Sequence, residues 1–301
     1  QAPAEAVAKC RERYRVGYDV LRRQRFEKQK QLGLVPDTMS LPLFDREFGG
    51  KRPAWTDLNE QQQKQWIESM ATYAAMIEIM DEGIGQLVQA IREKGMLENT
   101  VFLFLSDNGA TEEGGFIGQL MSDLSNTPYR SYKKWCFQGG TSTPFILTYG
   151  DPKKNTHQGE VCDQPAHIID VMPTCMALGG VRYPKKMAHS DLPGENLLPV
   201  IQDGKTHERT LFFEHQGSCA VIHGTWKLVR ANRNVAWELY DLSRDPFETQ
   251  DLAKQDPERV EAFEAEWVEW ANTHKVFPLE DKSWTERINF YKAKNPDQRG
   301  E

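Results

Sequence analysis

Two oxygen-bearing side chains stand directly after an apolar segment of this sequence. Residues 101–105 are all apolar, and Ser106-Asp107-Asn108-Gly109 follows them. A carboxylate and an amide oxygen are hard donors of the kind that Ca²⁺ or Mg²⁺ prefers. Asn-Gly is also a favoured turn dipeptide. The residue types alone therefore leave two interpretations open, a metal-binding rim and a simple turn.

A basic group follows further along the chain. Arg130, Lys133 and Lys134 precede a Gly-Gly pair at 139–140. A lysine that reaches an anion beside a bound cation suits phosphoryl or sulfuryl transfer, although a solvated basic loop has the same composition. We interpret residues 110–143 as one long glycine-studded loop, and loops of that length are usually functional. This context favours a site over a turn.

A strand has to position the two oxygen donors. The apolar run at 101–105 shows no alternation, which predicts a parallel strand buried on both faces. Residues 144–149 predict a second central strand. In open α/β sheets, ligands collect at the carboxyl ends of the strands, and Asp107 and Asn108 would lie at such an end.

A long helix precedes the first strand. Apolar residues recur over 66–91 at alternating steps of 4 and 3, which predicts one continuous helical stripe. Asp57 together with Glu60 predicts the N-terminal cap. Gly95 predicts the end of the helix.

The apolar stripe of this helix is broad. A coiled coil is one explanation, but the breadth favours packing on a sheet. Gly83 and Gly85 weaken a helix by up to about 1 kcal/mol each relative to Ala, so we expect close packing around them.

The remaining segments predict further helices and a second, smaller sheet. Residues 1–35 predict basic helix, 36–57 an irregular connection, and 165–180 a helix bent by Pro173. Short strands at close spacing predict an antiparallel meander, followed by a helix that carries apolar residues at helical spacing. The strands are 210–215, 219–224, 225–231 and 236–242, and the helix residues are Val260, Phe263, Trp267 and Trp270. We expect three parts: 1–190, 191–275 and a polar tail at 276–301.

Composition narrows the class of protein. The chain has 301 residues, a net charge of -7 and 39% hydrophobic residues, as expected of a globular protein. Its mild acidity argues against nucleic acid as the main partner. No apolar run is long enough to span a bilayer. The 5 cysteines lack the spacing of a disulfide framework or a zinc site, and we expect buried thiols.

Four motifs in order resemble type I sulfatases, which belong to the alkaline-phosphatase-like superfamily. They are MATYAAMIEIMDEGIGQLVQAI (70–91), NTVFLFLSDNGA (99–110), YKKWCFQGGTSTPFI (132–146) and YDLSRDPFETQDLA (240–253). The resemblance covers roughly residues 1–275. It implies an α/β fold with part of a mixed sheet flanked by helices, plus a small C-terminal antiparallel sheet packed with a helix. It also implies a periplasmic or extracellular location.

The resemblance also implies roles for individual residues. Asp107 and Asn108 match two ligands of a calcium ion, with magnesium the less favoured metal. Lys133 matches the catalytic lysine that contacts the sulfate, although Lys134 is adjacent and could take that role. His215 matches a segment that approaches the substrate, or it is a structural histidine at a strand end. The implied substrate is a sulfated small molecule or glycan.

One departure from the family is decisive. Sulfatases form a formylglycine nucleophile within a Cys/Ser-x-Pro-x-Arg motif, and the nearest segment here is NTPYR, with Asn126 at the nucleophile position. An Asp-Asp pair and a His-x-Pro segment are also missing. The resemblance therefore implies the C-terminal part of a sulfatase, inactive alone, whose partner is the missing N-terminal half. The alternatives are a phosphodiesterase or phosphatase of the same superfamily and a nucleophile-less binding module.

Overall fold

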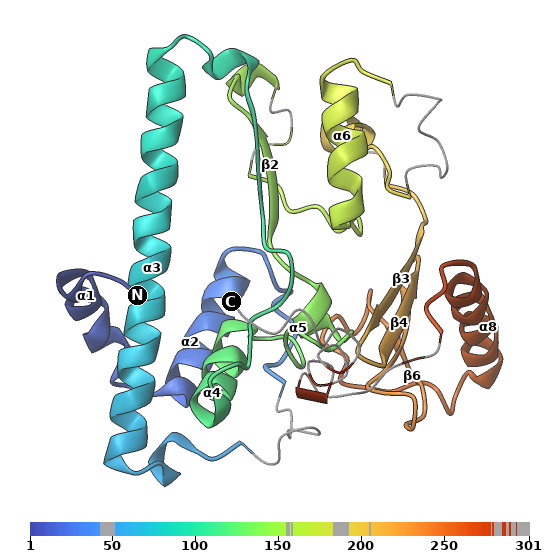
Figure 1. Cartoon of the computed structure of the whole chain (residues 1–301), viewed down its shortest axis with the longest axis horizontal. Coiled ribbons are helices and arrows are strands. Elements are labelled where there is room, and N and C mark those ends of the chain that lie inside the picture. The colour runs from blue at the N-terminus through green and yellow to red at the C-terminus, as the bar shows by residue number, and fades with distance from the viewer. Residues whose placement is uncertain are drawn as a thin grey trace.

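The computed structural model describes residues 1–42, 52–154, 157, 159–182, 193–204, 206–277 and 279, together with 285–286, 289 and 293. The long helix α3 (Glu60–Glu93) runs along one side, and a four-stranded sheet covered by α8 (Pro257–Thr273) lies on the other (Figure 1). The strands β1 (Val101–Leu105) and β2 (Phe145–Tyr149) lie between them. The predicted boundary near 190 and most of the predicted tail fall outside the described residues.

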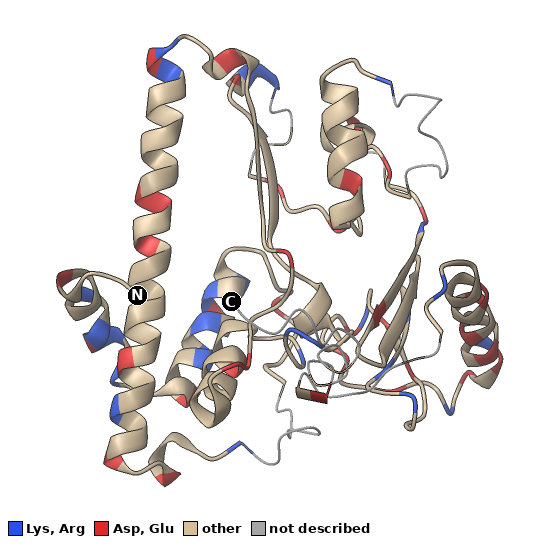
Figure 2. Cartoon of the chain, in the orientation of Figure 1, with Lys and Arg blue, Asp and Glu red and all other residues tan. Residues whose placement is uncertain are grey.

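The N-terminal segment forms two helices, α1 (Ala4–Tyr14) and α2 (Tyr18–Gln31), as the sequence predicted. Basic side chains gather on α1 and α2, whereas acidic side chains follow α8 (Figure 2). Arg25 of α2 donates to the carbonyl oxygens of Leu124 and Ser125, both at 2.9 Å. At least this arginine therefore ties helices together instead of facing solvent.

The N-terminal cap of α3 differs from the prediction. Asn59 and Gln62 cap each other reciprocally, with the Gln62 N–H 2.9 Å from Asn59 Oδ1 and the Asn59 N–H 3.1 Å from Gln62 Oε1. Asp57 instead accepts from the Ala54 N–H at 3.0 Å and holds the short 3₁₀ turn η1 (Trp55–Asp57). Asn59 is the N-cap in place of Asp57 because it is the residue at the helix boundary whose backbone dihedrals are not helical. Gly95, with φ 67°, ends the helix as predicted.

The two halves of α3 have different surroundings. In the N-terminal half, Trp66 is fully buried, with three aromatic rings edge-on to its indole at 5.3–5.9 Å, namely Tyr14, Tyr18 and Trp55. From Tyr73 onward the apolar face is exposed, at Tyr73, Met76, Ile77, Met80, Ile84 and Leu87. The sheet that was expected to cover this half is not among the described residues. A Cβ on Gly83 or Gly85 would meet no atom within 4 Å, so none of the described residues packs closely against these glycines.

The strand β1 is correctly placed, but its environment was predicted wrongly. It pairs antiparallel with β2, with Leu103 opposite Leu147, and the two strands form a two-stranded sheet. Phe104 is 39% exposed and Ile146 is 55% exposed. An unbroken apolar run predicts that both faces of the strand are buried in the complete protein. It does not fix the direction of the partner strand or guarantee that this chain supplies the cover.

The segment between β1 and β2 is not one long loop. It contains α4 (Gly115–Ser125) and the short α5 (Gln138–Thr141). Ile117, Leu120 and Leu124 of α4 are buried in the core that α1 and α3 share. The composition of this segment did not predict α4, because the glycines around it are residues that usually mark loops.

The C-terminal sheet confirms its prediction. The strands β3 (Thr210–His215), β4 (Ser218–His223), β5 (Trp226–Arg230) and β6 (Glu238–Asp241) form an antiparallel meander in that order. The helix α8 packs on it with Phe263 and Trp267, and Trp267 is fully buried. A second core joins Cys136 and Phe137 to this sheet.

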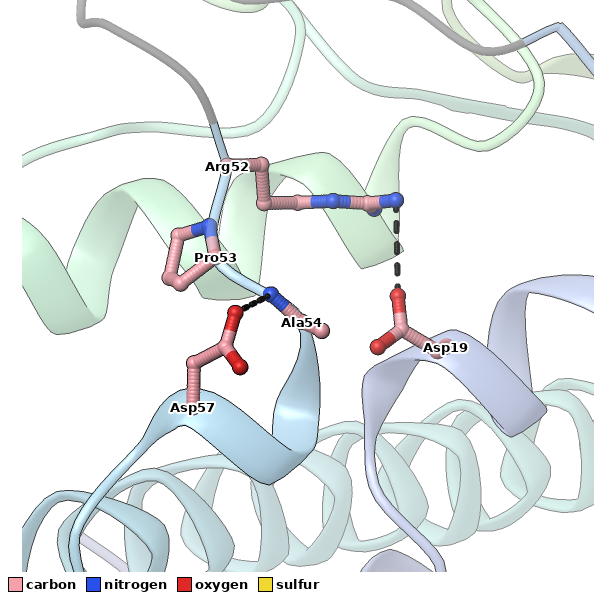
Figure 3. Close-up of a pocket in the computed structure, with 5 residues that line it drawn as sticks. All are labelled: Asp19, Arg52, Pro53, Ala54 and Asp57. Atoms are coloured by element: carbon pink, nitrogen blue, oxygen red, sulfur yellow. Dashed lines mark hydrogen bonds and ion pairs between the residues drawn. The ribbon is translucent and has the colours of Figure 1, made fainter.

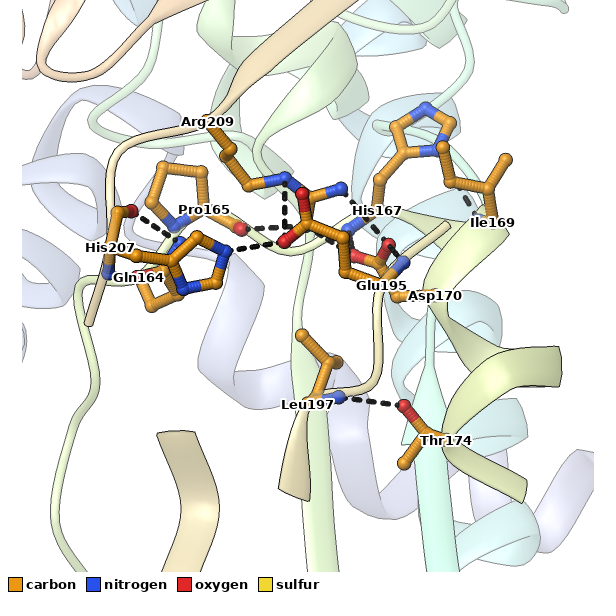
Figure 4. A network of polar contacts seen from close by, with 10 residues as sticks. All are labelled: Gln164, Pro165, His167, Ile169, Asp170, Thr174, Glu195, Leu197, His207 and Arg209. Atoms are coloured by element: carbon orange, nitrogen blue, oxygen red, sulfur yellow. Dashed lines mark hydrogen bonds and ion pairs between the residues drawn. The ribbon is translucent and has the colours of Figure 1, made fainter. Parts of the chain in front are cut away.

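The predicted helix at 165–180 is split into a 3₁₀ turn, η4 (Ile168–Asp170), and α6 (Val171–Leu178). A buried ion pair anchors this region (Figure 4): Asp170 lies 2.7 Å from Arg209 Nη1 and 3.0 Å from Nη2. Asp170 also accepts from the backbone N–H groups of His167 and Glu195. The short helix α7 (Leu198–Asp203) follows, together with the 3₁₀ turns η2 (Leu97–Asn99) and η3 (Pro152–Lys154) elsewhere.

All five cysteines are free. Cys10, Cys136 and Cys219 are buried as expected, whereas Cys162 and Cys175 are exposed. Burial raises the pKa of Cys136 to about 12 and that of Cys219 to about 11, so both thiols stay protonated at neutral pH. Within the described residues, no helix combines the length and apolarity needed to cross a membrane.

Candidate active site

The predicted oxygen donors lie at the carboxyl end of β1. Asp107 is exposed and Asn108 is half-buried. The Asn108 side-chain amide donates to Asp107 Oδ1 at 2.7 Å, and Ser106 Oγ donates to the Asn108 carbonyl oxygen at 2.8 Å. The two side chains are thus held together, with carboxylate and amide oxygens on an accessible rim.

The glycines of two motifs are in direct contact. The Gly109 N–H donates to the Gly140 carbonyl oxygen at 3.1 Å. A Cβ added to Gly109 would lie 1.8 Å from the Gly139 carbonyl oxygen, and one added to Gly139 would lie 2.1 Å from that of Ser131. Only glycine permits these backbone approaches. We call Asp107 and Asn108 the rim, and the segment that carries Arg130, Lys133 and Lys134 the basic loop. The Gly-Gly pair therefore fixes the rim next to the basic loop.

Asn126 joins the three segments of the site. Its Oδ1 accepts from the Ala110 N–H at 3.1 Å. Its Nδ2 donates to the carbonyl oxygens of Ser131 at 2.9 Å and Gly139 at 2.8 Å. The sequence singled out this residue only as the one at the nucleophile position. The signal that could have revealed its role is chemical: a side-chain amide both donates and accepts, so it can cross-link backbones.

The basic loop lies against the rim. The Lys133 N–H donates to the Ala110 carbonyl oxygen at 2.9 Å, and its ammonium lies 3.9 Å from Glu113 Oε1. The Lys134 ammonium instead lies over the Trp135 ring, 4.6 Å from its centroid. Ser131 and Lys134 have positive φ values of 61° and 91°. Such strained backbone at non-glycine residues clusters at functional sites.

Glu112 is a neighbour that sequence reasoning missed. Burial raises the pKa of its carboxyl group, while the charge of Lys134 acts in the opposite direction. Its Oε2 is buried and has no hydrogen-bond partner among the described residues. The basic loop therefore faces carboxyl groups from the segment after the rim, and the local charge is mixed.

His215 reaches the site from the other sheet. It ends β3, as predicted, and its Nδ1 lies 3.1 Å from the Lys134 carbonyl oxygen. Its side chain is exposed. The structure thus brings the end of the C-terminal sheet against the basic loop, and this contact is compatible with both a structural role and a substrate-facing role.

Two ion pairs from the C-terminal sheet hold the basic loop, and sequence reasoning found neither. Arg130 Nη1 lies 2.6 Å from Glu238 Oε2 and donates to the Tyr240 hydroxyl at 2.9 Å. Lys227 and Glu248 form the second pair at 2.8 Å, and both side chains are 0% exposed. No local pattern in the sequence indicates these contacts, because the partners lie far apart along the chain.

Asp107 and Asn108 offer a carboxylate and an amide oxygen, which are donors of the kind that Ca²⁺ prefers. Ca²⁺ takes about six to eight oxygen ligands, so these two residues would hold it only together with further ligands. Within the part of the chain that the structure describes, no group of three or more His, Cys, Asp or Glu residues could hold a metal ion.

A pocket elsewhere is a weaker candidate. It lies between the start of α2 and η1 and is lined by Asp19, Arg52, Pro53, Ala54 and Asp57 (Figure 3). Its charged groups are engaged with their neighbours: Arg52 Nη2 lies 3.4 Å from Asp19 Oδ1, and Asp57 accepts from the Ala54 N–H. None of the residues at the end of β1 lines it.

The residues at the end of β1 and the basic loop beside them lie within the region that a family model matches, and the chain belongs to the sulfatase family. The sulfatase family profile matches residues 6–181, and the profile of the N-sulphoglucosamine sulphohydrolase C-terminal region matches residues 129–269.

Relatives and solved structures agree with this assignment. The chain is 28% identical over 333 residues to an uncharacterized sulfatase of Schizosaccharomyces pombe, covering 97% of this chain and 59% of that protein. It is 30% identical over 229 residues to an arylsulfatase of Klebsiella aerogenes, covering 67% and 47%. The chain thus spans about half the length of the curated relatives it matches.

Two solved structures share the fold. The crystal structure of Ps i-CgsB has a TM-score of 0.58 at 21% identity and covers 94% of this chain and 60% of that one. The structure of BT4656, in complex with its substrate D-glucosamine-2-N,6-O-disulfate, has a TM-score of 0.55 at 22% identity and covers 73% and 44%.

Proposed function

We propose that this chain forms the sulfate-binding part of a calcium-dependent sulfatase that hydrolyses sulfate esters. One observation carries the proposal: the rim of Asp107 and Asn108, the loop of Lys133 and the end of β3 at His215 meet in one place. These residues come from three separate segments. Backbone hydrogen bonds join the first two, and the His215 side chain contacts the Lys134 carbonyl oxygen. Such a convergence of oxygen donors and cations suits a site for an anionic ester.

In this proposal each residue has a role. Asp107 and Asn108 would hold calcium, which when bound supplies a Lewis acid. Lys133 neutralises sulfate oxygens, and it is a better candidate than Lys134 because the Lys134 ammonium lies over Trp135. His215 would contact the substrate from the end of β3, with its Nδ1 held against the Lys134 carbonyl oxygen. A formylglycine from the missing N-terminal half would supply the nucleophile.

The missing half is also the proposed partner of the exposed apolar surfaces. The C-terminal half of α3 and the faces of β1 and β2 expose large apolar side chains, with Leu87 at 56% and Ile146 at 55%. Apolar side chains gathered on an exposed face mark a site of association. Gly83 and Gly85 lie along the same part of α3 and leave room for close packing. The length of the relatives supports a covering segment from the same protein.

The substrate class rests on relatives. One relative is named arylsulfatase, and another, from Bacteroides thetaiotaomicron, is named N-acetylgalactosamine-6-O-sulfatase. We therefore propose aryl or carbohydrate sulfates as substrates. A periplasmic or extracellular location remains a prediction from the same family.

The test compares the intact enzyme, defined as this chain joined to its N-terminal half, with the chain alone. We expect the intact enzyme to hydrolyse an aryl sulfate with calcium bound, and the chain alone to be inactive. Asp107→Ala in the intact enzyme should abolish both turnover and calcium retention, measured by metal analysis after gel filtration. Ordinary turnover by the chain alone, or full calcium retention by Asp107→Ala, would contradict the proposal.

A further inference from the structure

The Lys227–Glu248 pair is buried at the junction of the C-terminal sheet and the candidate site. Lys227 belongs to β5, and Glu248 follows β6. The ammonium lies 2.8 Å from Glu248 Oε1, and both side chains are 0% exposed.

Both members of the pair hold Gln138. The Gln138 N–H donates to Glu248 Oε2 at 2.8 Å. Lys227 Nζ donates to Gln138 Oε1 at 3.0 Å. The backbone and the side chain of one residue are therefore fixed at the same time, which leaves the residue little freedom to shift.

Gln138 leads directly to the rim. Gly139 and Gly140 follow it in the chain, and the Gly140 carbonyl oxygen accepts from the Gly109 N–H at 3.1 Å. Gly109 follows Asp107 and Asn108. A displacement of Gln138 would move the Gly-Gly pair. Because the pair lies so close to Gly109, Gly109 would have to move as well.

The chemistry of the pair favours positioning over stabilisation. The desolvation of a buried ion pair offsets most of its attraction, and well-packed apolar residues often replace such a pair at no cost in stability. Glu248 also adopts a positive φ of 58°, a conformation that a non-glycine residue keeps only when its surroundings impose it. Arg209 and Asp170 form a comparably buried pair that does not contact the site.

We propose that the Lys227–Glu248 pair is a positioning device for the sulfate site, which holds the Gly-Gly pair and thereby the metal-binding rim in place. This inference rests on the proposed function. It gives the C-terminal sheet a part in the reaction beyond the contact between His215 and the Lys134 carbonyl oxygen.

The double variant Lys227→Met/Glu248→Met tests the proposal in the intact enzyme. It removes both charges, so its melting temperature should stay close to that of the wild type. It also releases Gln138, so kcat for an aryl sulfate should fall by about 100-fold with KM little changed, because small displacements of a reacting geometry are that costly. Calcium retention should weaken as well.

The matched control is Asp170→Asn/Arg209→Met, which neutralises the other buried pair. We expect it to keep the kcat and calcium retention of the wild type. If the Lys227→Met/Glu248→Met variant does not fold, Gln138→Ala takes its place. It leaves the ion pair intact, and we expect it to lower kcat without lowering the melting temperature.

Hydrogen exchange of the chain alone separates this inference from the proposed function. The amides of Gly109, Gly139 and Gly140 are hydrogen-bonded in the wild type. They should exchange faster in Lys227→Met/Glu248→Met and at the wild-type rate in the control. Unchanged exchange together with wild-type kcat would overturn the inference. Failure of the wild-type intact enzyme to hydrolyse any sulfate ester would overturn the proposed function, and the exchange rates would still decide the geometry.

Discussion

The two sheets that the described residues form are both antiparallel and both rich in apolar residues, yet only one of them is covered. In the C-terminal sheet, Leu228 and Leu239 are fully buried beneath α8. In the β1–β2 pair, Phe104 and Ile146 are exposed. The chain supplies a helix for the first sheet, whereas the described residues supply no cover for the exposed faces of the second. The difference shows that an apolar strand is buried only where the chain also supplies the element that covers it, and it motivates the proposal that another part of the protein covers β1–β2.

The largest expected effect concerns the covered sheet. Trp267→Ala removes the fully buried indole between α8 and the strands and should destabilise the chain by about 3–5 kcal/mol. Val268→Ala on the same helix is the matched control, because Val268 is 36% exposed, and it should cost less than about 1 kcal/mol. Urea unfolding of the chain alone measures both. Equal losses of stability for the two variants would contradict the claim that burial under α8 stabilises the C-terminal sheet.

The next largest effect is expected at the contact between Gly109, which follows β1, and Gly139, which precedes β2. Gly109→Ala places a Cβ 1.8 Å from the Gly139 carbonyl oxygen. The backbone must shift, and kcat of the intact enzyme should fall by about 100-fold. In the chain alone, Gly109→Ala should lower the melting temperature, whereas Gly85→Ala should raise stability by about 0.5–1 kcal/mol, because nothing lies near its Cβ. A fully active Gly109→Ala enzyme would refute the close contact.

A smaller effect tests the uncovered surface. Leu87→Ala should change the stability of the chain alone by less than about 0.5 kcal/mol, since Leu87 is 56% exposed. In the intact enzyme the same change should cost about 2 kcal/mol or more, because the side chain would be buried by the partner half. Thermal unfolding of both forms measures the difference. An equally small loss in both would show that nothing covers this part of α3.

The smallest effect is a dependence on pH in the region between the sheets. Burial alone would raise the pKa of Asp170, but hydrogen bonds from Arg209 and from the N–H groups of Glu195 and His167 hold it below its usual value. A depressed carboxyl pKa contributes stability above the unfolded value of about 3.9, and that stability is lost as the pH falls. Asp170→Asn should therefore flatten the acid limb of a stability–pH curve. An unaltered acid limb would refute this linkage.

Local patterns predicted the covered sheet well. The sequence predicted β3 at 210–215, where it lies, and the other three strands within two residues of their observed ends. Hairpin strands and their turns are determined by neighbours in the sequence, so short-range reasoning suffices. The same reasoning placed β1, β2 and the end of α3.

Contacts between residues that lie far apart in the chain could not be predicted from the sequence. The Glu248–Gln138 hydrogen bond joins residues 110 positions apart, and the Lys227–Gln138 bond joins residues 89 apart. The antiparallel direction of β1 was also missed, because an apolar run does not specify its partner. Of the site, the sequence indicated Asp107, Asn108, Lys133 and His215 but not the amide of Asn126 that links the segments.

The rate of aryl sulfate hydrolysis by the intact enzyme, compared between Lys133→Ala and Lys153→Ala, tests the central claim most directly. Lys133 lies beside the rim at the end of β1, whereas Lys153 is an exposed lysine of η3. Loss of a cation that neutralises the sulfate should lower kcat by about 100-fold or more, and Lys153→Ala should leave it unchanged. Equal, near-wild-type rates for the two variants would contradict the assignment of the sulfate site.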